Sequence, residues 1–314
     1  MAELSFIGID VSKSTLDVHI LPQGKHMQVT NDNAGLTRLT AILTKQTTGL
    51  CVFEATGHYS RDLHNALSAA KLPVSCVNPR QASFYIKSIT PSHKTDKSDA
   101  AALAHMAKNM DLPETLPPTA LEQALQEFVN TKLDFTAQKT AAKNRLQSLI
   151  SPLLIKQTRL LIVQLESNIA QIDTEIEALI KADSTLRKKA AILETIPGIG
   201  KASAFAILAL MPEIGTLNEK QVASLLGVAP IARDSGTFKG KRYCRGGRGT
   251  LRSLLYLPTL TATRSNKILH EFYIRLRKNG KSHKTALIAS MRKLIIYANS
   301  LVKNDDKWDY SLDS

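Results

Sequence analysis

Cysteine and long hydrophobic runs are both scarce in this 314-residue sequence. The three cysteines, Cys51, Cys76 and Cys244, lie far apart and none belongs to a Cys-x-x-Cys motif, so neither a disulfide framework nor a zinc site is indicated. No uninterrupted apolar run approaches the roughly 20 residues of a membrane-spanning helix. The opening residues Met-Ala-Glu-Leu lack the basic region and apolar core of a secretory signal. We therefore expect a reduced, cytoplasmic protein that does not enter a membrane.

Acidic residues are scarce in the last quarter of the chain. Residues 231–314 contain 18 Lys and Arg against 6 Asp and Glu, whereas residues 1–100 contain 10 against 8 and residues 101–230 contain 13 against 13. Most of the net charge of +14 is therefore C-terminal. A basic region of this kind indicates a nucleic-acid partner. An anionic membrane is a less suitable partner because no basic amphipathic anchor is present. The sequence also lacks a Walker A motif, so ATP use is not indicated.

Four acidic residues in the first hundred positions have the arrangement of a metal site. Asp10 lies inside a short apolar run and Glu54 ends another, and both runs predict buried strands. Burying a carboxylate is costly unless it is paired or binds a cation. Asp96 and Asp99 stand three residues apart where a helix is expected to begin, which places them on one helical face. Convergent carboxylates are typical ligands of Mg²⁺ or Mn²⁺.

Each acid also has an ordinary structural interpretation. Asp96 is a candidate helix N-cap, Asp99 a first-turn residue that suits the helix dipole, and Glu54 a solvent-exposed strand end. Asp10 is the hardest to explain in this way, because an acid within an apolar strand needs a partner. The order strand Asp, strand Glu, helix Asp-x-x-Asp favours a metal site over four unrelated roles.

The first part of the chain alternates predicted strands and helices. Strands are expected at residues 4–11, 15–22, 50–54 and 73–78, and helices at 33–47, at 60–71 and from about 96. The order β-β-α-β-α-β-α predicts an α/β domain of the RNase H-like, or RuvC-like, kind. Pro113, Pro117 and Pro118 indicate a linker after it. We expect a catalytic domain over 1–115, a helical coiled-coil region over 116–189, a mostly α-helical domain over 190–303 and an acidic tail over 304–314.

The middle of the chain has a helical pattern that Pro152 divides into two segments. Apolar residues between Ile162 and Leu179 alternate steps of three and four, which is the spacing of a coiled coil. Two interpretations remain open. The segment is either a dimerisation arm or spacer, or an ordinary helical hairpin packed within its own chain.

Two glycine-rich segments near the C-terminus are candidate phosphate contacts. Residues 196–201, Ile-Pro-Gly-Ile-Gly-Lys, predict the turn of a helix-hairpin-helix element, in which glycine lets backbone N–H groups approach a phosphate. The polar loop 229–242 and the Arg-Gly-Gly-Arg-Gly segment precede an expected helix at 251–256. The candidate nucleic-acid contacts are Lys201, Arg233, Lys239, Lys241, Arg242, Arg245 and Arg248. A packed glycine turn and a solvated basic loop are the structural alternatives, and Ser235 by itself indicates only a turn.

Together these segments resemble a known family. Residues 7–13, 53–57 and 94–100 look like the N-terminal DEDD domain of the IS110-type insertion-sequence transposases and the related Piv DNA invertases. Residues 196–200, 227–230, 235–236 and 249–252 look like the C-terminal transposase domain of that family. The resemblance covers nearly the whole chain, and transposase and invertase share these motifs.

The resemblance implies specific roles. Asp10, Glu54, Asp96 and Asp99 match the family's metal-binding tetrad, and Ser235 matches the serine that attacks DNA. The family pattern further implies a homo-oligomer, a dimer or tetramer, in which a DEDD domain and a serine domain from different subunits form the site. For insertion-sequence members it implies that a structured bridge RNA selects the DNA.

Three other functions are consistent with parts of the sequence. Residues 8–15 resemble the phosphate-binding hairpin of sugar kinases and actin-like ATPases, although Ser12 stands where those proteins usually have glycine. A nucleic-acid binder without catalytic activity would use the acids structurally. A RuvC-like endonuclease would need the carboxylates but not Ser235.

Overall fold

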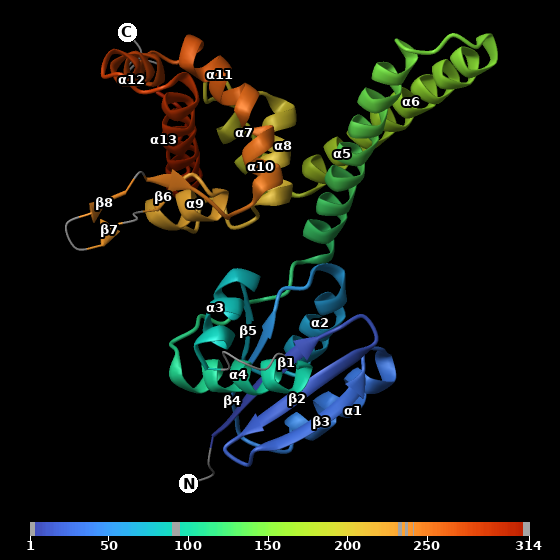
Figure 1. Ribbon diagram of the computed structural model, residues 1–314, viewed down its shortest axis with the longest axis vertical. Helices are drawn as coiled ribbons and strands as arrows, with labels where there is room; N and C mark the ends of the chain where they lie inside the picture. The colour runs from blue at the N-terminus through green and yellow to red at the C-terminus, as the bar shows by residue number, and fades with distance from the viewer. Residues whose placement is uncertain (1–3, 90–94, 232–233, 236–237, 241, 310–314) are drawn as a thin grey trace. The chain divides into compact units, whose positions relative to one another are not determined.

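The computed structural model contains two compact units, Met1–Pro118 and Thr119–Ser314 (Figure 1). It describes residues 4–89, 95–231, 234–235, 238–240 and 242–309. The helical region 119–189 shares one unit with the C-terminal helices. Among the helices of the described residues, none is both long enough and apolar enough to cross a membrane.

A mixed five-stranded sheet forms the centre of the first unit, with strand order β3-β2-β1-β4-β5. The strands are β1 (Ser5–Val11), β2 (Thr15–Leu21), β3 (Lys25–Thr30), β4 (Thr48–Glu54) and β5 (Val74–Val77). The pairs β1–β2 and β2–β3 are antiparallel, whereas β1–β4 and β4–β5 are parallel. This mixed α/β arrangement agrees with the predicted RNase H-like domain.

Strand β3 was not predicted from the sequence, and its omission is the main error in the predicted strand order. Lys25, His26 and Gln28 make the segment polar, and Val29 is its only buried residue. Its hydrophobic alternation is therefore weak, as is common in a strand at the edge of a sheet. The chain enters β3 through a turn at Gly24, whose φ of 66° favours glycine.

Helices cover both faces of this sheet. Helices α1 (Asn33–Leu43) and α2 (Arg61–Ala69) pack through Leu39 and Leu63 against Ile7 and Ile9 of β1. On the opposite face, α4 (Asp96–Asn109) packs through Leu103 against Val52 of β4, and α3 (Pro79–Ile89) joins the same cluster. A short 3₁₀ helix, η1 (Gly57–Ser60), precedes α2.

Helix α4 approaches β1 closely because the residues at the contact are small. A Cβ atom added to Gly8 would collide with the backbone of Ala100 and Ala104. Gly8 therefore lets the helix lie directly on the strand. This contact places the first turn of α4 near the C-terminal end of β1, where Asp10 lies.

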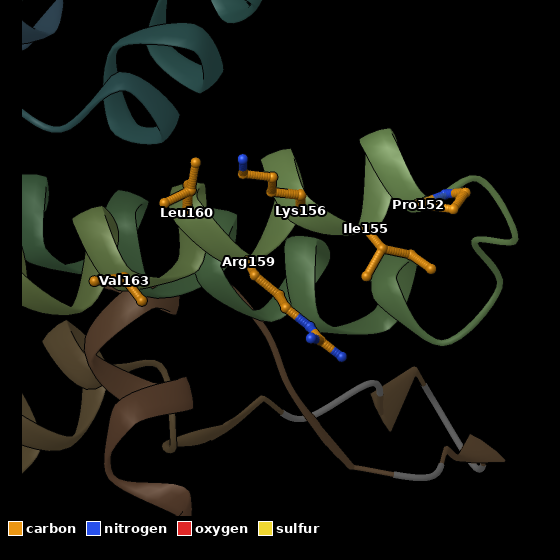
Figure 2. Close-up of a pocket in the computed structure, with 6 residues that line it drawn as sticks. All are labelled: Pro152, Ile155, Lys156, Arg159, Leu160 and Val163. Atoms are coloured by element: carbon orange, nitrogen blue, oxygen red, sulfur yellow. The ribbon is translucent and has the colours of Figure 1, made fainter.

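The second unit begins with a long helical hairpin. Helices α5 (Ala120–Leu146) and α6 (Pro152–Ala182) pack against each other, and Ile172 and Ile176 of α6 belong to the core of the unit. The heptad-like spacing thus forms a hairpin within one chain. Near the start of α6, Leu153, Leu160 and Val163 are 65%, 55% and 64% exposed, and Leu160 and Val163 line a hollow with Ile155, Lys156 and Arg159 (Figure 2).

The remainder of the second unit consists of helices of 6 to 22 residues and of two-residue strands. The helices are α7 (Ser184–Glu194), α8 (Lys201–Leu210), α9 (Glu219–Leu226), α10 (Gly249–Leu254), α11 (Tyr256–Ser265), α12 (Lys267–Lys278) and α13 (His283–Asn304). The strands are β6 (Pro230–Ile231), β7 (Asp234–Ser235), β8 (Phe238–Lys239) and β9 (Tyr243–Cys244). Helices α8 and α13 both contribute residues to the core of the unit, and these side chains are almost completely buried.

Candidate functional site

Asp10 and Glu54 lie at the same edge of the sheet. Parallel strands β1 and β4 pair Ile9 with Phe53, and each acid follows directly after these partners. Both carboxylate residues are half-buried. Since the carboxyl ends of parallel strands meet at one sheet edge, the two strands bring these acids to neighbouring positions.

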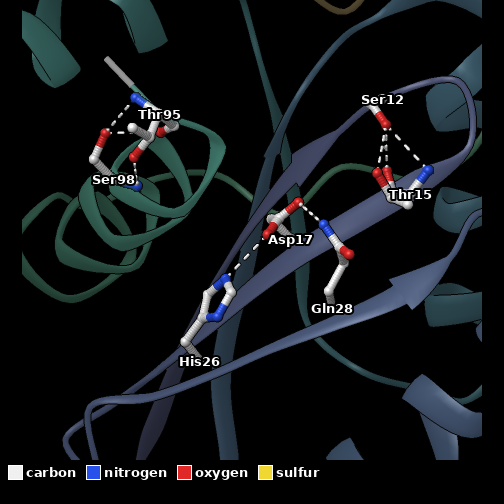
Figure 3. Close-up of polar contacts among 7 residues, drawn as sticks. All are labelled: Ser12, Thr15, Asp17, His26, Gln28, Thr95 and Ser98. Atoms are coloured by element: carbon white, nitrogen blue, oxygen red, sulfur yellow. Dashed lines mark hydrogen bonds and ion pairs between the residues drawn. The ribbon is translucent and has the colours of Figure 1, made fainter. Parts of the chain in front are cut away.

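The other two predicted ligands lie in the first turn of α4. Thr95 is the N-cap: its hydroxyl accepts from the backbone N–H of Ser98, 3.1 Å away, and Ser98 Oγ accepts from the Thr95 N–H at 2.9 Å (Figure 3). Asp96 is therefore not the N-cap that the structural alternative required. Asp96 is exposed, and Asp99 is only 6% exposed.

Asp10, Glu54, Asp96 and Asp99 form a group that we call the carboxylate cluster. Burial and then the negative charges of Asp96, Asp99, Glu54 and Asp17 raise the pKa of Asp10 to about 6. Asp96, Asp99 and Glu54 therefore lie close enough to Asp10 for their negative charges to act on it. The fold therefore concentrates negative charge at this edge of the sheet.

Sequence reasoning missed Asp17. It is the cross-strand partner of Asp10 and is 6% exposed. His26 Nε2 lies 3.0 Å from its Oδ1, and Gln28 Nε2 donates to its Oδ2 at 2.9 Å (Figure 3). The signal was present in β2, where Asp17 and His19 alternate with three apolar residues. It is interpretable only once the pairing with β1 and β3 is known.

The donor chemistry of the carboxylate cluster fits a hard divalent cation, because its ligand atoms are carboxylate oxygens and their charges repel. Among the described residues, no three or more His, Cys, Asp or Glu side chains converge into one coordination sphere. The carboxylate cluster thus fits a divalent cation through the type of its ligand atoms and through its negative charge.

Ser235 lies in a small hairpin. Strand β7 pairs with β8, with Asp234 opposite Lys239 and Ser235 opposite Phe238. The polar loop of the sequence analysis thus contains short strands, and β6 pairs with β9 next to it. Arg233 and Lys241 lie outside the described residues, as do the side chains of Ser235 and Lys239.

The remaining predicted nucleic-acid contacts have different surroundings. Arg242 and Arg245 are exposed. Lys201 is 52% exposed and lies 2.6 Å from Glu177. Arg248 donates to both carboxylate oxygens of Glu213, each at 2.6 Å. Arg245 is therefore better placed than Arg248 to contact a phosphate.

The Ile-Pro-Gly-Ile-Gly turn joins α7 to α8 as predicted. Its two glycines differ in their surroundings. Gly198 has a φ of 101°, and an added Cβ atom would lie 2.5 Å from Cβ of Ala262 in α11. Gly200 caps α8, and nothing lies within 4 Å of its added Cβ. Only the Gly200 side of the turn is open, at the N-terminus of a helix.

Comparisons with known proteins agree on one family. A model described as a transposase with an IS110-type DEDD domain matches residues 7–154, and one described as the IS116/IS110/IS902 transposase family matches residues 190–274. The pilin gene-inverting proteins of Moraxella lacunata and Moraxella bovis are each 29% identical over 97% of this chain and 98% of their own length. The transposase of IS1111A from Coxiella burnetii is 19% identical over 75% of this chain and 71% of its own. The two matched ranges contain the carboxylate cluster and Ser235.

Proposed function

The chain belongs to the IS110 family of transposases and is an enzyme that cuts and rejoins DNA strands, and we propose that Ser235 is its nucleophile and that the carboxylate cluster holds a divalent cation. The observation that carries this proposal is the repulsion within the cluster. Burial and four neighbouring carboxylates, Asp17 as well as the other three of the cluster, raise the pKa of Asp10 to about 6, and a bound cation would offset that charge.

In the proposed reaction the oxygen of Ser235 attacks a DNA phosphorus. A bond from phosphorus to the serine oxygen forms as the bond to a deoxyribose oxygen breaks, and one proton passes from serine to the leaving oxygen. The phosphodiester becomes a phosphoserine ester, so strand exchange needs no ATP. Asp10, Glu54, Asp96 and Asp99 would hold Mg²⁺ or Mn²⁺, which would supply Lewis-acid polarisation of the phosphate.

The basic residues near Ser235 hold the DNA phosphates in this proposal. Arg242 and Arg245 are exposed beside the β6–β9 pair, and Arg233, Lys239 and Lys241 are their neighbours in sequence. Positive side chains at this place bind the DNA backbone and stabilise charge that develops on the attacked phosphate. Lys201, at the open end of the helix-hairpin-helix turn, adds a more distant contact.

We extend the proposal to self-association. The family resemblance implies a dimer or tetramer, and the α5–α6 hairpin exposes apolar side chains such as Leu154, 50% exposed, and Leu161, 45% exposed. Apolar side chains that gather on a surface mark protein contacts. Light scattering of wild type and of Leu153→Gln/Leu160→Gln tests this, with a smaller mass expected for the variant. A variant mass equal to that of wild type contradicts the role of the hairpin.

A guide RNA is the second extension, and it is supported by the family resemblance and the basic C-terminal unit. We expect a structured RNA to co-purify with the protein and recombination to stop after RNase treatment. Recombination of naked DNA by RNA-free protein would instead support an invertase that needs no guide. The two Moraxella relatives, named as pilin gene-inverting proteins, make site-specific inversion the second candidate function.

Ser235→Ala tests the central proposal. DNA binding should survive, because the basic residues and the carboxylate cluster are intact. The stability change should stay within about 0.5 kcal/mol, as for ordinary surface substitutions. Denaturing the reaction should trap a covalent protein–DNA adduct with wild type and with the matched control Thr237→Ala, but not with Ser235→Ala. Cleavage by Ser235→Ala at the wild-type rate would favour a RuvC-like endonuclease that activates water.

A further inference from the structure

Helix α12 and the turn that follows it form a strongly basic segment outside the loop assigned above. Residues 267–284 contain one acid, Glu271, and six lysines and arginines. The six are Lys267, Arg275, Arg277, Lys278, Lys281 and Lys284, which we call the α12 basic surface. The segment thus contributes a net charge of +5 in 18 residues of a chain whose total is +14.

All six side chains are exposed, and none forms an ion pair with an acid in the part of the chain that the structure describes. Several lysines elsewhere in the same unit do have acidic partners. Lys132 pairs with Asp173, Lys143 with Glu166 and Lys188 with Asp305. Positive charges that lack an acidic partner within the chain and face solvent favour an external polyanion.

The fold presents these charges on one side of α12. Leu269 is buried, and Phe272 and Leu276 follow it at helical spacing towards α11 and α13. Lys267 and Lys278 lie eleven residues apart, which is close to three turns, so they point the same way. Figure 1 shows α12 beside α11 and α13 at the margin of its unit.

The aromatic residues of α12, Phe272 and Tyr273, are half-buried and already contact other side chains. The Phe272 ring has Lys293 Nζ 4.6 Å from its centroid and Arg275 Cζ at 5.5 Å. The Tyr273 hydroxyl lies 2.6 Å from His283 Nδ1. Proteins that bind single strands stack bases on exposed aromatic rings. The α12 basic surface has charge without such rings, which suits the backbone of a duplex.

We infer that the α12 basic surface binds the sugar-phosphate backbone of duplex DNA independently of sequence, as a second contact besides the loop around Ser235. Phosphate contacts of this kind fix position and orientation without reading bases. The choice of DNA over other polyanions rests on the proposed function.

The test compares two triple variants of the full-length protein. Lys267→Gln/Lys278→Gln/Lys281→Gln removes three charges from the α12 basic surface. Lys132→Gln/Lys143→Gln/Lys188→Gln removes three charges that have internal partners. Circular dichroism confirms that both variants fold. Affinity for 30-base-pair duplexes of two unrelated sequences is then measured between about 0.05 and 0.3 M salt.

The slope of log K against log salt should fall by about 2–3 for the α12 variant on both duplexes, because each lost phosphate contact removes about 0.9. The control should change the slope by less than one. An unchanged slope for the α12 variant, or equal changes in both, overturns the inference. So does a loss confined to an RNA duplex of the same sequence, which would identify RNA as the partner.

Failure of the proposed function gives a different result. At saturating protein, the α12 variant should still form the covalent Ser235–DNA adduct, since its lost contacts affect binding only. If the adduct forms with Ser235→Ala, Ser235 is not the nucleophile, and the inference that the α12 basic surface binds DNA still stands. If binding weakens only for the α12 variant, the surface is confirmed whatever the nucleophile.

Discussion

Glu213 and Arg248 form a two-bond ion pair inside the second unit, with Nη1 to Oε2 and Nη2 to Oε1 distances of 2.6 Å each. Arg248 Nη1 also donates to the Leu210 carbonyl at the end of α8, 2.8 Å away. The pair ties the glycine-rich segment before α10 to the loop after α8. Neighbouring Arg245 is exposed, so the two arginines of one motif have different surroundings.

Arg248→Gln should therefore affect stability, whereas Arg245→Gln should affect DNA binding. Arg248→Gln should lower the free energy of unfolding by about 1–2 kcal/mol, because it removes charge-assisted hydrogen bonds that are partly screened by solvent. Arg245→Gln should leave stability within about 0.5 kcal/mol and lower the salt slope of DNA binding by about 1. Urea unfolding and salt titrations measure the two effects. Equal loss of affinity in both variants contradicts this division.

The Glu213–Arg248 pair should also make stability pH-dependent. Burial acts to raise the pKa of Glu213, but the hydrogen bonds and positive charge of Arg248 outweigh it and lower the pKa below its usual value. A lowered folded-state pKa stabilises the fold above the unfolded pKa of about 4.3, and this stabilisation disappears as pH falls through the folded pKa. Glu213→Gln should thus be less stable than wild type at pH 7, and the two should converge as the pH falls through the lowered pKa of Glu213. A difference in stability that does not shrink as the pH falls excludes the ion pair as its source.

Asn31 should control how well the carboxylate cluster binds a cation. Its Nδ2 donates to the carbonyls of Ser12 and Tyr59, at 2.9 and 3.0 Å, and so connects the segments that follow β1 and β4. Asn31→Ala leaves two carbonyls without this donor and should cost about 1–3 kcal/mol. It should also raise the Mg²⁺ concentration for half-maximal activity, because Asp10 is the penultimate residue of β1 and Glu54 the last residue of β4. Asn65→Ala, an exposed change on α2, is the control and should alter neither quantity.

Gly198→Ala and Gly200→Ala test the packing of the helix-hairpin-helix turn. Gly198→Ala should destabilise the second unit by about 2–4 kcal/mol, because its φ of 101° is strained for alanine and the new Cβ meets Ala262. Gly200→Ala faces open space and should cost at most about 1 kcal/mol, the loss of a favoured N-cap residue. Thermal melts compare them. Comparable melting temperatures would contradict close packing of Gly198 on α11.

Asp10→Asn should separate cation binding from folding. It removes the charge that burial and neighbouring acids oppose, so the variant in EDTA should be at least as stable as wild type. Mg²⁺ should raise the melting temperature of wild type only, since a ligand stabilises the state that binds it. Recombination should stop in the variant and in EDTA. Activity that persists in EDTA contradicts a metal-dependent mechanism.

The sequence alone predicted the strands, helix starts and turns that depend on residues close together in the chain. The apolar runs around Asp10 and before Glu54 form strands because alternating or buried apolar residues require that conformation. Helix α4 begins at Asp96 because Thr95 and Ser98 satisfy its free N–H groups. The Ile-Pro-Gly-Ile-Gly turn follows from its proline and glycines.

Tertiary structure decided which of these features meet. Asp17 becomes the neighbour of Asp10 through strand register, and Arg248 meets an acid 35 residues away. The heptad-like spacing of α6 forms a hairpin with α5 in the same chain, which periodicity cannot distinguish from pairing between chains. Strand β3 is held by its ladder with β2 despite its polar sequence. Each outcome depends on contacts between residues distant in sequence, and the chemistry of any one segment leaves its partner unspecified.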